Sequence, residues 1–443
     1  MNALEWAFTV GKLLLVFVPL TMIPIMIFME RKGASLIQDR VGPNRVSVPF
    51  FGGLRLFGFV HNVTDGIKLF TKELIVPKFA HKWYYIVAPM IPFAIAVMTP
   101  ALLPWCAPIV FEWGGSIYRI PGQILDADGG ILVVFALSGL SVYGTVLGAW
   151  SSNSKYALLG GLRASAMMIS YEVSMGLSLL GMFLLAGSFR LSDIVAWQGS
   201  HYWGVLIQPI PFVIYVISLI AETGRAPFDV AEGEPEILGH HLEYSGMRFG
   251  LFYMGEYAHI VINSLLIATM FLGGYDVPVL HTEGVKAHLG LVIAAILAVF
   301  GASALGLMVL LRRWAAIYAK TNSTDKVAHA REYAVTGVIF GGIGAALLAA
   351  AVLSALLIQT STTLVGGEAI YPLWTSLLTA FVQFGALFAK ALLFCWVWVW
   401  VRWSLPRFRY DQVMSLGWKI LLNVALVNLV VTALVAKLLQ GGR

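Results

Sequence analysis

Charged residues are scarce in this sequence: Asp, Glu, Lys and Arg make up only 12% of its 443 residues, whereas 59% are hydrophobic. This balance excludes an ordinary set of soluble domains and is typical of an integral membrane protein. The two cysteines, Cys106 and Cys395, adjoin apolar runs and are too few to ligate an iron–sulfur cluster, so we interpret both as packing residues. The sequence contains no Walker A motif, no HExxH and no GxGxxG after a strand, which argues against a soluble nucleotide site.

Long apolar runs are abundant instead. A transmembrane helix needs about 20 mostly apolar residues, and ten windows meet this requirement: 7–29, 84–104, 129–149, 165–187, 203–222, 250–274, 288–311, 334–357, 375–401 and 416–436. The first run is too long for a signal peptide and follows the acidic Glu5, so we expect it to remain as the first span. The sequence therefore predicts an all-α, polytopic bundle of about ten transmembrane helices.

The loops between these windows differ in positive charge. The odd-numbered loops carry 21 Lys and Arg residues and the even-numbered loops carry three. The positive-inside rule then predicts that the odd loops face the cytoplasm or its equivalent and that both termini face the outside. The net charge of +6 follows from this topology and does not indicate a nucleic-acid partner.

One inside loop has more acids than bases, and it reads "RAPFDVAEGEPEILGHHLEYSG" over residues 225–246. Pro235 favours an extended chain, in which alternate glutamates share one face, and mutual repulsion then raises the pKa of at least one carboxyl. The adjacent His240 and His241 lack metal-ligand spacing, so we expect no metal site. The alternative interpretation is a merely solvated acidic loop.

Charges inside the spans are costly, at about 3 kcal/mol each on insertion scales, and are functional candidates by default. Glu222 closes the fifth window, and Glu172 and Glu256 lie about 10 Å from the same inner end at 1.5 Å per residue. Snorkelling or helix pairing is the alternative role. Lys390 lies in mid-span and needs a counter-ion or a wet cavity, whereas Lys12 lies near an end and is expected to snorkel.

The first inside loop holds a second charged cluster. The stretch 54–74 mixes apolar residues with charged ones, including Asp65, Lys68 and Lys72, which is typical of an amphipathic segment at the membrane interface. A simple positive-inside anchor is the alternative. Together with the acidic loop, this stretch predicts a wall of both charge signs beside an apolar slot, suited to an amphiphile with a polar head.

Several ordered blocks resemble one family. The runs "MERKGASLIQDRVGPN", "AETGRAPFD", "EYSGMRFGLFYMGEY" and "LPRFRYDQVMSLGWK" are similar to the NuoH-type (chain 1) membrane subunit of respiratory complex I, the proton-pumping NADH:quinone oxidoreductase. The likeness covers residues 1–275 and 375–443. It implies a subunit that joins the peripheral arm to the membrane arm, forms much of the ubiquinone chamber and holds the first carboxylates that couple quinone reduction to proton pumping.

The resemblance also assigns residues to roles. Those expected to form the quinone chamber are Glu30, Arg31, Arg40, Asp65, Lys72, Glu73, Arg225, Phe228, Asp229, Glu232, Glu234, Glu236 and Glu243. Those expected to form the proton path are Glu172, Glu222, Glu256 and Lys390. The chain departs from the family at Gly224, where Asn is usual, at Val230 and Ala231, where Leu-Pro is usual, and by one missing residue between Glu236 and Glu243.

The resemblance implies a division of the chain and a set of partners. Residues 1–275 form the core with the chamber loops, 276–374 an insertion that adds two spans to a family core of eight, and 375–443 the last two core spans. The chain itself is expected to hold no redox centre, cofactor or metal. Quinone is the substrate, and FMN, iron–sulfur clusters and NADH belong to partner subunits of the peripheral arm. Small membrane subunits and the lipid bilayer complete the surroundings, in a bacterial inner membrane with periplasmic termini.

The inserted pair of spans has a pattern of its own. The run "TGVIFGGIGAALLAAA" is rich in small residues and predicts close packing against a neighbouring helix. Two other functions remain open. One is the equivalent subunit of a membrane-bound hydrogenase or ferredoxin-linked complex. The other is an ion-coupled secondary transporter, which would require an internal repeat and a broken-helix site at mid-membrane, and no repeat is evident.

Overall fold

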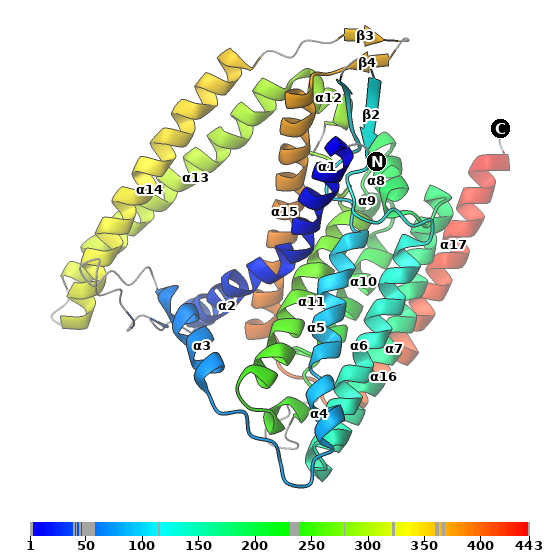
Figure 1. The fold of residues 1–443 in the computed structure, drawn as a ribbon, viewed down its shortest axis with the longest axis vertical. Helices are drawn as coiled ribbons and strands as arrows, with labels where there is room; N and C mark the ends of the chain where they lie inside the picture. The colour runs from blue at the N-terminus through cyan, green and yellow to red at the C-terminus, as the bar shows by residue number, and fades with distance from the viewer. Residues whose placement is uncertain are drawn as a thin grey trace.

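The computed structural model describes residues 3–38, 40, 42–43, 46, 58–113, 116–230, 239–278, 280–320, 324–358, 363–365 and 368–441. Within these residues, nine helices are long and apolar enough to cross a membrane. The helices form one elongated bundle with both chain termini at the same end, at the top of Figure 1. The predicted all-α membrane fold is therefore confirmed.

The first part of the chain supplies most of the bundle. Its helices are α1 (Ala3–Leu13), η1 (Leu14–Phe17), α2 (Val18–Ile37), α3 (Val60–Thr71), α4 (Lys82–Val87), α5 (Met90–Met98), η4 (Thr99–Leu102), α6 (Gly130–Ser151), α7 (Lys155–Ala186), α8 (Leu191–Ser200), α9 (Gly204–Ile207), α10 (Pro209–Glu222), η5 (His240–Glu243) and α11 (Met247–Phe271).

The second part adds α12 (Thr282–Ala287), α13 (Leu289–Ala319), α14 (Thr324–Leu357), α15 (Leu373–Ser404), α16 (Tyr410–Ser415), the π-helical η6 (Leu416–Leu421) and α17 (Leu422–Gly441). Two antiparallel hairpins lie at the end that carries the termini (Figure 1). They pair β1 (Ile109–Trp113) with β2 (Ser116–Ile120), and β3 (Thr363–Val365) with β4 (Glu368–Ile370).

Several predicted spans differ from the structure; for example, α14 starts at Thr324 rather than at residue 334. The window 203–222 is not one helix, because α9 ends at Ile207 and α10 has only 14 residues, or about 21 Å of helix. The cause is Pro209, which disfavours helical geometry at Gln208 (φ −128°, ψ 61°) and starts a new helix. The fourth span also begins earlier than expected, because α7 starts at Lys155 rather than at residue 165.

Helix α11 lies at the centre of the bundle. It packs against α2, α5 and α15, and most of its span is buried. On the other side of the bundle, α7 packs against α6, α10 and α17. The core between these helices holds large, fully buried side chains such as Tyr171, Tyr215, Tyr257 and Phe271. Helix α10 contacts both α7 and α11, so Glu172 of α7, Glu222 at the end of α10 and Glu256 of α11 lie on neighbouring helices.

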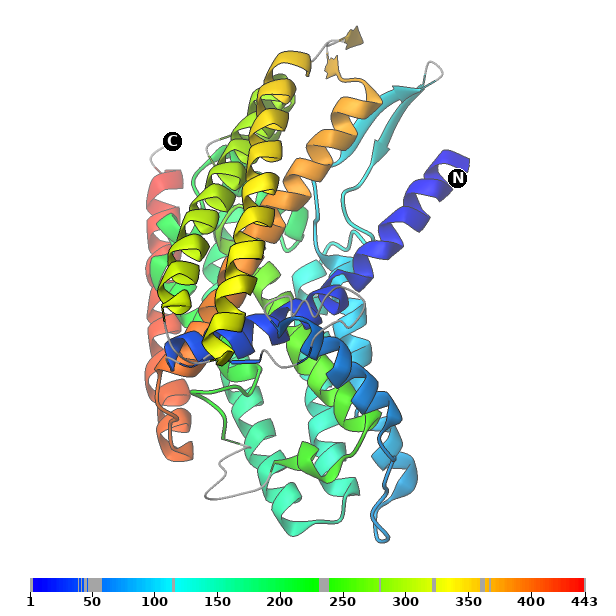
Figure 2. The same cartoon turned by 90° about the vertical axis from the view of Figure 1, so that its left-hand side faces the viewer.

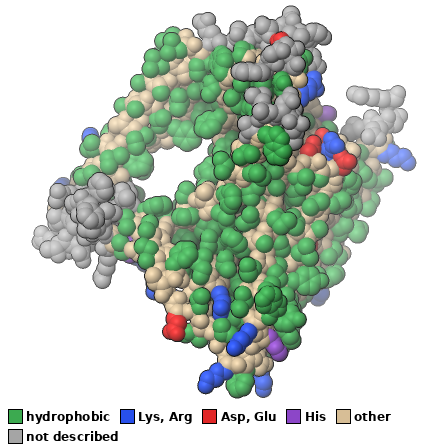
Figure 3. All heavy atoms as spheres, viewed as in Figure 1, with side chains coloured by type: hydrophobic (Ala, Val, Ile, Leu, Met, Phe, Trp, Pro, Cys, Tyr) green, Lys and Arg blue, Asp and Glu red, His purple; other side chains and the backbone are tan. Residues whose placement is uncertain are grey.

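Helices α13 and α14 form a long hairpin that leans away from the bundle. Its two helices run side by side in Figure 2. Figure 3 shows an opening between this hairpin and the rest of the molecule, bordered by apolar side chains. A Cβ atom on Gly344 would lie 2.9 Å from the Gly301 carbonyl oxygen, so only glycine permits this approach. The predicted close packing of the eighth span is confirmed, and its neighbour is α13.

Candidate functional site

Arg225 follows the end of α10 and turns back onto α11. The turn passes through Gly224 at φ +60°, a left-handed conformation that glycine and asparagine both tolerate, so this departure from the family preserves the turn. Arg225 is 7% exposed, and its Nη2 atom donates to Glu256 Oε2 at 2.6 Å. Burial, the largest single effect, lowers the pKa of Arg225, but the Glu256 carboxylate together with Tyr257, Glu30 and Tyr253 outweighs it and holds the pKa above its ordinary value.

Two tyrosines extend this ion pair across α11. The Arg225 guanidinium lies 4.7 Å from the Tyr257 ring centre and 5.4 Å from that of Tyr253, a favourable cation–π geometry. The Tyr257 hydroxyl donates to Glu30 Oε2 at 2.5 Å. Glu30 in turn pairs with Arg402, at 2.6 Å between Oε1 and Nη1. We call this set the arginine–glutamate cluster: Glu30, Arg225, Tyr253, Glu256, Tyr257 and Arg402.

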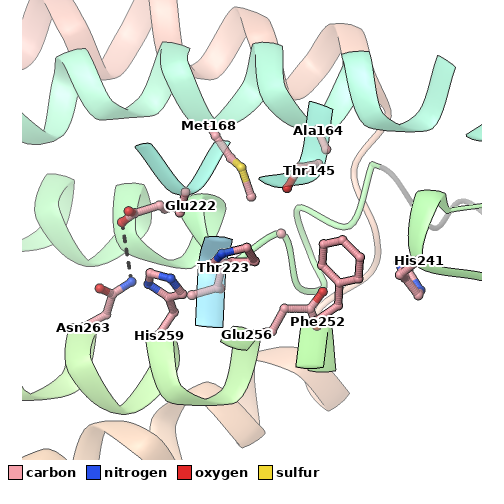
Figure 4. A pocket seen from close by; sticks show the side chains of 13 residues that line it. Thr145, Ala164, Met168, Glu222, Thr223, His241, Phe252, Glu256, His259 and Asn263 are labelled. Carbon is pink, nitrogen blue, oxygen red and sulfur yellow. Dashed lines mark hydrogen bonds between the residues drawn. The ribbon is translucent and has the colours of Figure 1, made fainter. Parts of the chain in front are cut away.

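A cavity of about 70 Å³ adjoins the cluster. Figure 4 shows it bordered by Glu256, His259 and Asn263 of α11, by Glu222 and Thr223 at the end of α10, and by His241. The Asn263 amide donates to Glu222 Oε2 at 3.5 Å. The remaining lining residues are Pro92, Ser141, Thr145, Ala164, Met168, Gly224 and Phe252. A space of this volume, bordered by several polar side chains, has room for several water molecules.

A second, smaller cavity of about 10 Å³ continues from the first. Glu222, His259 and Asn263 border both, and Ser138 of α6 borders the second. The Ser138 hydroxyl donates to Glu172 Oε1 at 3.5 Å. A Cβ on the neighbouring Gly139 would lie 3.1 Å from the same oxygen, so a glycine there leaves room for the carboxyl. The three carboxyls Glu256, Glu222 and Glu172 thus form an ordered carboxylate line.

The acidic loop is described only in part. Glu232, Glu234, Glu236 and Pro235 lie outside the described residues. The described start of the loop is well packed: the Phe228 ring lies 5.5 Å from Tyr171 and 5.6 Å from Phe408. The buried Asp229 lies 3.5 Å from Arg407 in the "LPRFRYDQ" block. The structure therefore joins two blocks that are 178 positions apart in the sequence.

The first loop meets the same end of the bundle. An ion pair between Arg31 and Asp65 joins α2 to α3. The apolar side chains Val63, Ile67 and Phe70 of α3 are exposed, in agreement with the amphipathic segment predicted there. The remaining predicted residues do not reach the arginine–glutamate cluster: Arg40, Lys72 and Glu73 have exposed side chains.

Ser245 and Glu243 connect the two loops through the backbone. The Ser245 hydroxyl donates to the Glu73 carbonyl at 3.0 Å and accepts from the Ile75 amide at 2.9 Å. The Glu243 carbonyl accepts from the Tyr85 hydroxyl at 2.7 Å. These contacts explain how the chamber residues predicted from two distant loops lie at one end of the molecule.

Lys390 lies apart from the carboxylate line. Its Nζ atom donates to the backbone carbonyls of Leu272, Gly274 and Asp276 at 2.7, 2.8 and 2.6 Å. It also lies 4.8 Å from the Trp203 ring centre. A cation at the carbonyl end of a helix is favourable, so the end of α11 satisfies this lysine.

Asp276 adds an observation that the sequence did not predict, and Lys12 differs from its prediction. Burial raises the pKa of Asp276 to about 6, an effect that Lys390 and His281 oppose. Lys12, predicted to snorkel, instead donates to the carbonyls of Pro121 and Gln123, both at 3.3 Å.

Sequence reasoning missed several residues of the site. His259 and Asn263 follow Glu256 by three and seven positions, which places all three on one face of α11. That spacing was readable in "EYAHIVIN". His241 was set aside as a poor metal ligand, yet it borders the larger cavity. Ser138 had no sequence signal, because only the packing of α6 against α7 brings it to Glu172.

A family model described as NADH dehydrogenase matches residues 11–324 and 327–433. The chain belongs to this family. It is 37% identical over 432 residues to the NADH-quinone oxidoreductase H subunit 1 of Geobacter metallireducens, covering 97% of each chain. It is 34% identical to NADH-quinone oxidoreductase subunit 8 of Rhodothermus marinus, over 93% of this chain and 91% of the relative.

A further member of the family, the NADH-quinone oxidoreductase H subunit 1 of Cytophaga hutchinsonii, is 32% identical over 91% of this chain and 89% of its own. The alignment with the Geobacter metallireducens protein leaves out only 3% of either chain. Residues 276–374, which include the α13–α14 hairpin, therefore have counterparts in that family member.

Proposed function

We propose that this chain is a membrane subunit of a proton-translocating NADH:quinone oxidoreductase, that it helps to form the quinone chamber, and that it holds the first carboxylates of the coupling path. One observation carries the proposal. The Arg225–Glu256 ion pair stands where the acidic loop meets α11, and the cavity beside it also reaches Glu222. A charge change near the loop therefore acts on Glu256, the first carboxyl of a half-buried line.

The chamber itself is proposed at the end of the bundle where the first loop and the acidic loop meet. Glu30, Arg31, Asp65, Arg225 and Asp229 are all held there by ion pairs of opposite sign. The exposed apolar face of α3 lies beside them. An isoprenoid quinone has a polar ring and an apolar tail, and a charged wall beside an apolar face suits both parts.

Coupling then follows from electrostatics. Reduction of a quinone bound near the arginine–glutamate cluster leaves negative charge beside it, and nearby carboxylates respond by binding protons. Glu256 is the first of them, because it already shares Arg225 with the loop. Glu222 and Glu172 continue the carboxylate line toward the remainder of the membrane arm. Electrons reach the quinone from redox centres of partner subunits, and this chain contributes no redox step of its own.

Orientation and location complete the proposal. The loops rich in Lys and Arg favour a chamber end on the cytoplasmic face of a bacterial inner membrane. Both termini then face the periplasm. Lys390, about 24 Å along α11 from Glu256 at 1.5 Å per residue, lies on the far side of the carboxylate line and is proposed as a later station of the proton path.

The test uses the chain within its complex. The tagged protein is purified in mild detergent, and co-purification with iron–sulfur and flavin subunits is expected. Glu256→Gln should lower quinone reduction and proton pumping in inverted vesicles, whereas Glu283→Gln, an exposed glutamate of α12 whose side chain is 71% accessible, should not.

Three outcomes would overturn the proposal. The first is migration of the chain alone, without redox partners. The second is full activity of the Glu256→Gln complex. The third is assembly with a hydrogenase or ferredoxin-linked partner that does not reduce quinone, which would favour the related membrane-bound complexes instead.

A further inference from the structure

His259 has no role in the functions discussed so far. It lies on α11 between Glu256 and Asn263, and it borders both the larger and the smaller cavity. Its Nε2 atom is shielded from solvent and has no hydrogen-bond partner among the described residues. The other ring nitrogen hydrogen-bonds to the Pro92 carbonyl of α5. The ring is therefore held at one nitrogen and open at the other.

This geometry determines the tautomer of the neutral ring. Because a carbonyl oxygen only accepts, Nδ1 carries the proton that binds Pro92, and Nε2 presents a bare lone pair. Buried acceptors in folded proteins nearly always have a donor. An unpartnered lone pair beside a cavity with room for water can accept a proton from a neighbouring acid, and imidazole is a side chain that serves as a proton shuttle.

The groups around His259 are arranged on two sides. Figure 4 shows Glu256 on one side of the ring and Glu222 with Asn263 on the other. Helix α10 and its following turn contribute Glu222 and Arg225, η5 contributes His241, and α7 contributes Glu172 beyond the smaller cavity. Helix α6 offers the hydroxyls of Ser138, Ser141 and Thr145, and α5 offers only the Pro92 carbonyl.

We propose that His259 is the proton relay between Glu256 and Glu222. A proton leaves the Glu256 carboxyl, crosses the larger cavity and forms an N–H bond at Nε2. That bond then breaks, and the same proton forms an O–H bond on the Glu222 carboxylate. The other proton stays bonded to Nδ1, with its hydrogen bond to the Pro92 carbonyl, so the ring returns to its starting tautomer and no electrons are exchanged.

The inference rests on the proposed function and deepens it. It assigns a positioning and relay role to a residue that touches no substrate, and it bridges the step from Glu256 to Glu222, which no direct hydrogen bond spans within the described residues. Glu222 reaches α11 through Asn263, and Glu172 reaches α6 through Ser138. Between Glu256 and Glu222, His259 is the titratable side chain that borders both cavities.

The first experiment removes the ability of the side chain at position 259 to carry a proton. In His259→Gln an amide of similar reach still donates to Pro92 but does not take up a proton at neutral pH. The complex is assembled in inverted vesicles, and dye quenching reports pumped protons while NADH oxidation reports quinone reduction. We expect pumping per quinone reduced to fall roughly tenfold, a modest share of what acid–base groups contribute. His201→Gln, an exposed histidine after α8, serves as the matched control and should match the wild type.

The second experiment separates relay from structure. His259→Ala enlarges the existing cavity, and added imidazole should restore pumping with a rate that rises with pH as free imidazole deprotonates. A His259→Ala complex that assembles and is not rescued overturns the relay. So does a His259→Gln complex that pumps as well as the wild type.

The two levels of the proposal fail in different ways. If Glu222→Gln and Glu256→Gln abolish pumping while His259→Gln does not, the relay is wrong and the proposed function stands. If all three variants pump normally in assembled complexes, the carboxylate line itself is wrong. If His259→Gln prevents incorporation of the chain while His259→Ala incorporates and pumps, the residue has a packing role only and the relay is wrong.

Discussion

Arg225 and Glu256 form an ion pair with 2.6 Å between Nη2 and Oε2, and the arginine side chain is only 9% exposed. This pair ties the first residues of the acidic loop to the central helix α11. It also stands next to the cavity that reaches Glu222. One guanidinium therefore connects the described start of the acidic loop to the start of the carboxylate line.

Removing one member of the Arg225–Glu256 pair should lower the stability of the protein. Arg225→Met leaves the Glu256 carboxylate without its partner, and because that side chain is 32% exposed the cost should fall below the about 3–5 kcal/mol that is typical of a fully buried pair. The double variant Arg225→Met with Glu256→Gln should recover a large part of that loss, because no unpaired charge remains. Thermal unfolding of the purified complex, analysed as a double-mutant cycle, measures the coupling. Strictly additive effects would show that the pair does not act as a unit.

Asp276 should make stability depend on pH. Burial raises its pKa from 3.8 to about 6, so the folded state binds this proton more tightly than the unfolded state. The stabilisation is present below pH ~4 and is lost as pH rises through about 6, a change on the order of 2–3 kcal/mol. Asp276→Asn should remove this component. Melting temperatures of both proteins from pH 4 to 7 should converge at low pH and diverge above 6; parallel curves would contradict the prediction.

Lys390 should matter more for folding than its position in a helix suggests. Lys390→Met removes the donor to three carbonyls at the end of α11, and each buried acceptor left without a partner costs about 1–3 kcal/mol. We expect the melting temperature to fall by several degrees and less of the complex to assemble. Lys437→Met, at an exposed position of α17, is the matched control. Equal melting temperatures of the two variants would show that water replaces the lysine without cost.

The α13–α14 hairpin offers a test that leaves the site untouched. A leucine at Gly344 would place Cβ 2.9 Å from the Gly301 carbonyl oxygen and must separate the two helices, whereas a Cβ on Gly342 would meet no described atom within 4 Å. Gly344→Leu should therefore lower the melting temperature and Gly342→Leu should not. Quinone reduction per assembled complex should stay unchanged in both, and a loss in Gly344→Leu alone would connect the hairpin to the chamber.

Much of the architecture was predictable because hydropathy acts locally. The windows for α6, α11 and α15 needed only their own residues, since about 20 apolar positions suffice to define a span. The error at 203–222 also had a local cause, Pro209, whose effect on Gln208 outweighed the apolar pattern. The early start of α7 arose because hydropathy finds the apolar part of a helix, whereas the helix itself continues through Lys155 and Arg163.

The sequence by itself determined the membrane class, nearly all the spans, the family and the candidate acids. Only the tertiary structure decided which of these residues meet. Arg225 and Glu256 are 31 positions apart, Lys390 and Leu272 are 118 apart, and Tyr257 and Glu30 are 227 apart. Such pairs depend on how helices pack against one another, which no single stretch of sequence encodes. For the same reason His259 looked like an ordinary span residue until two cavities and two carboxyls were found beside it.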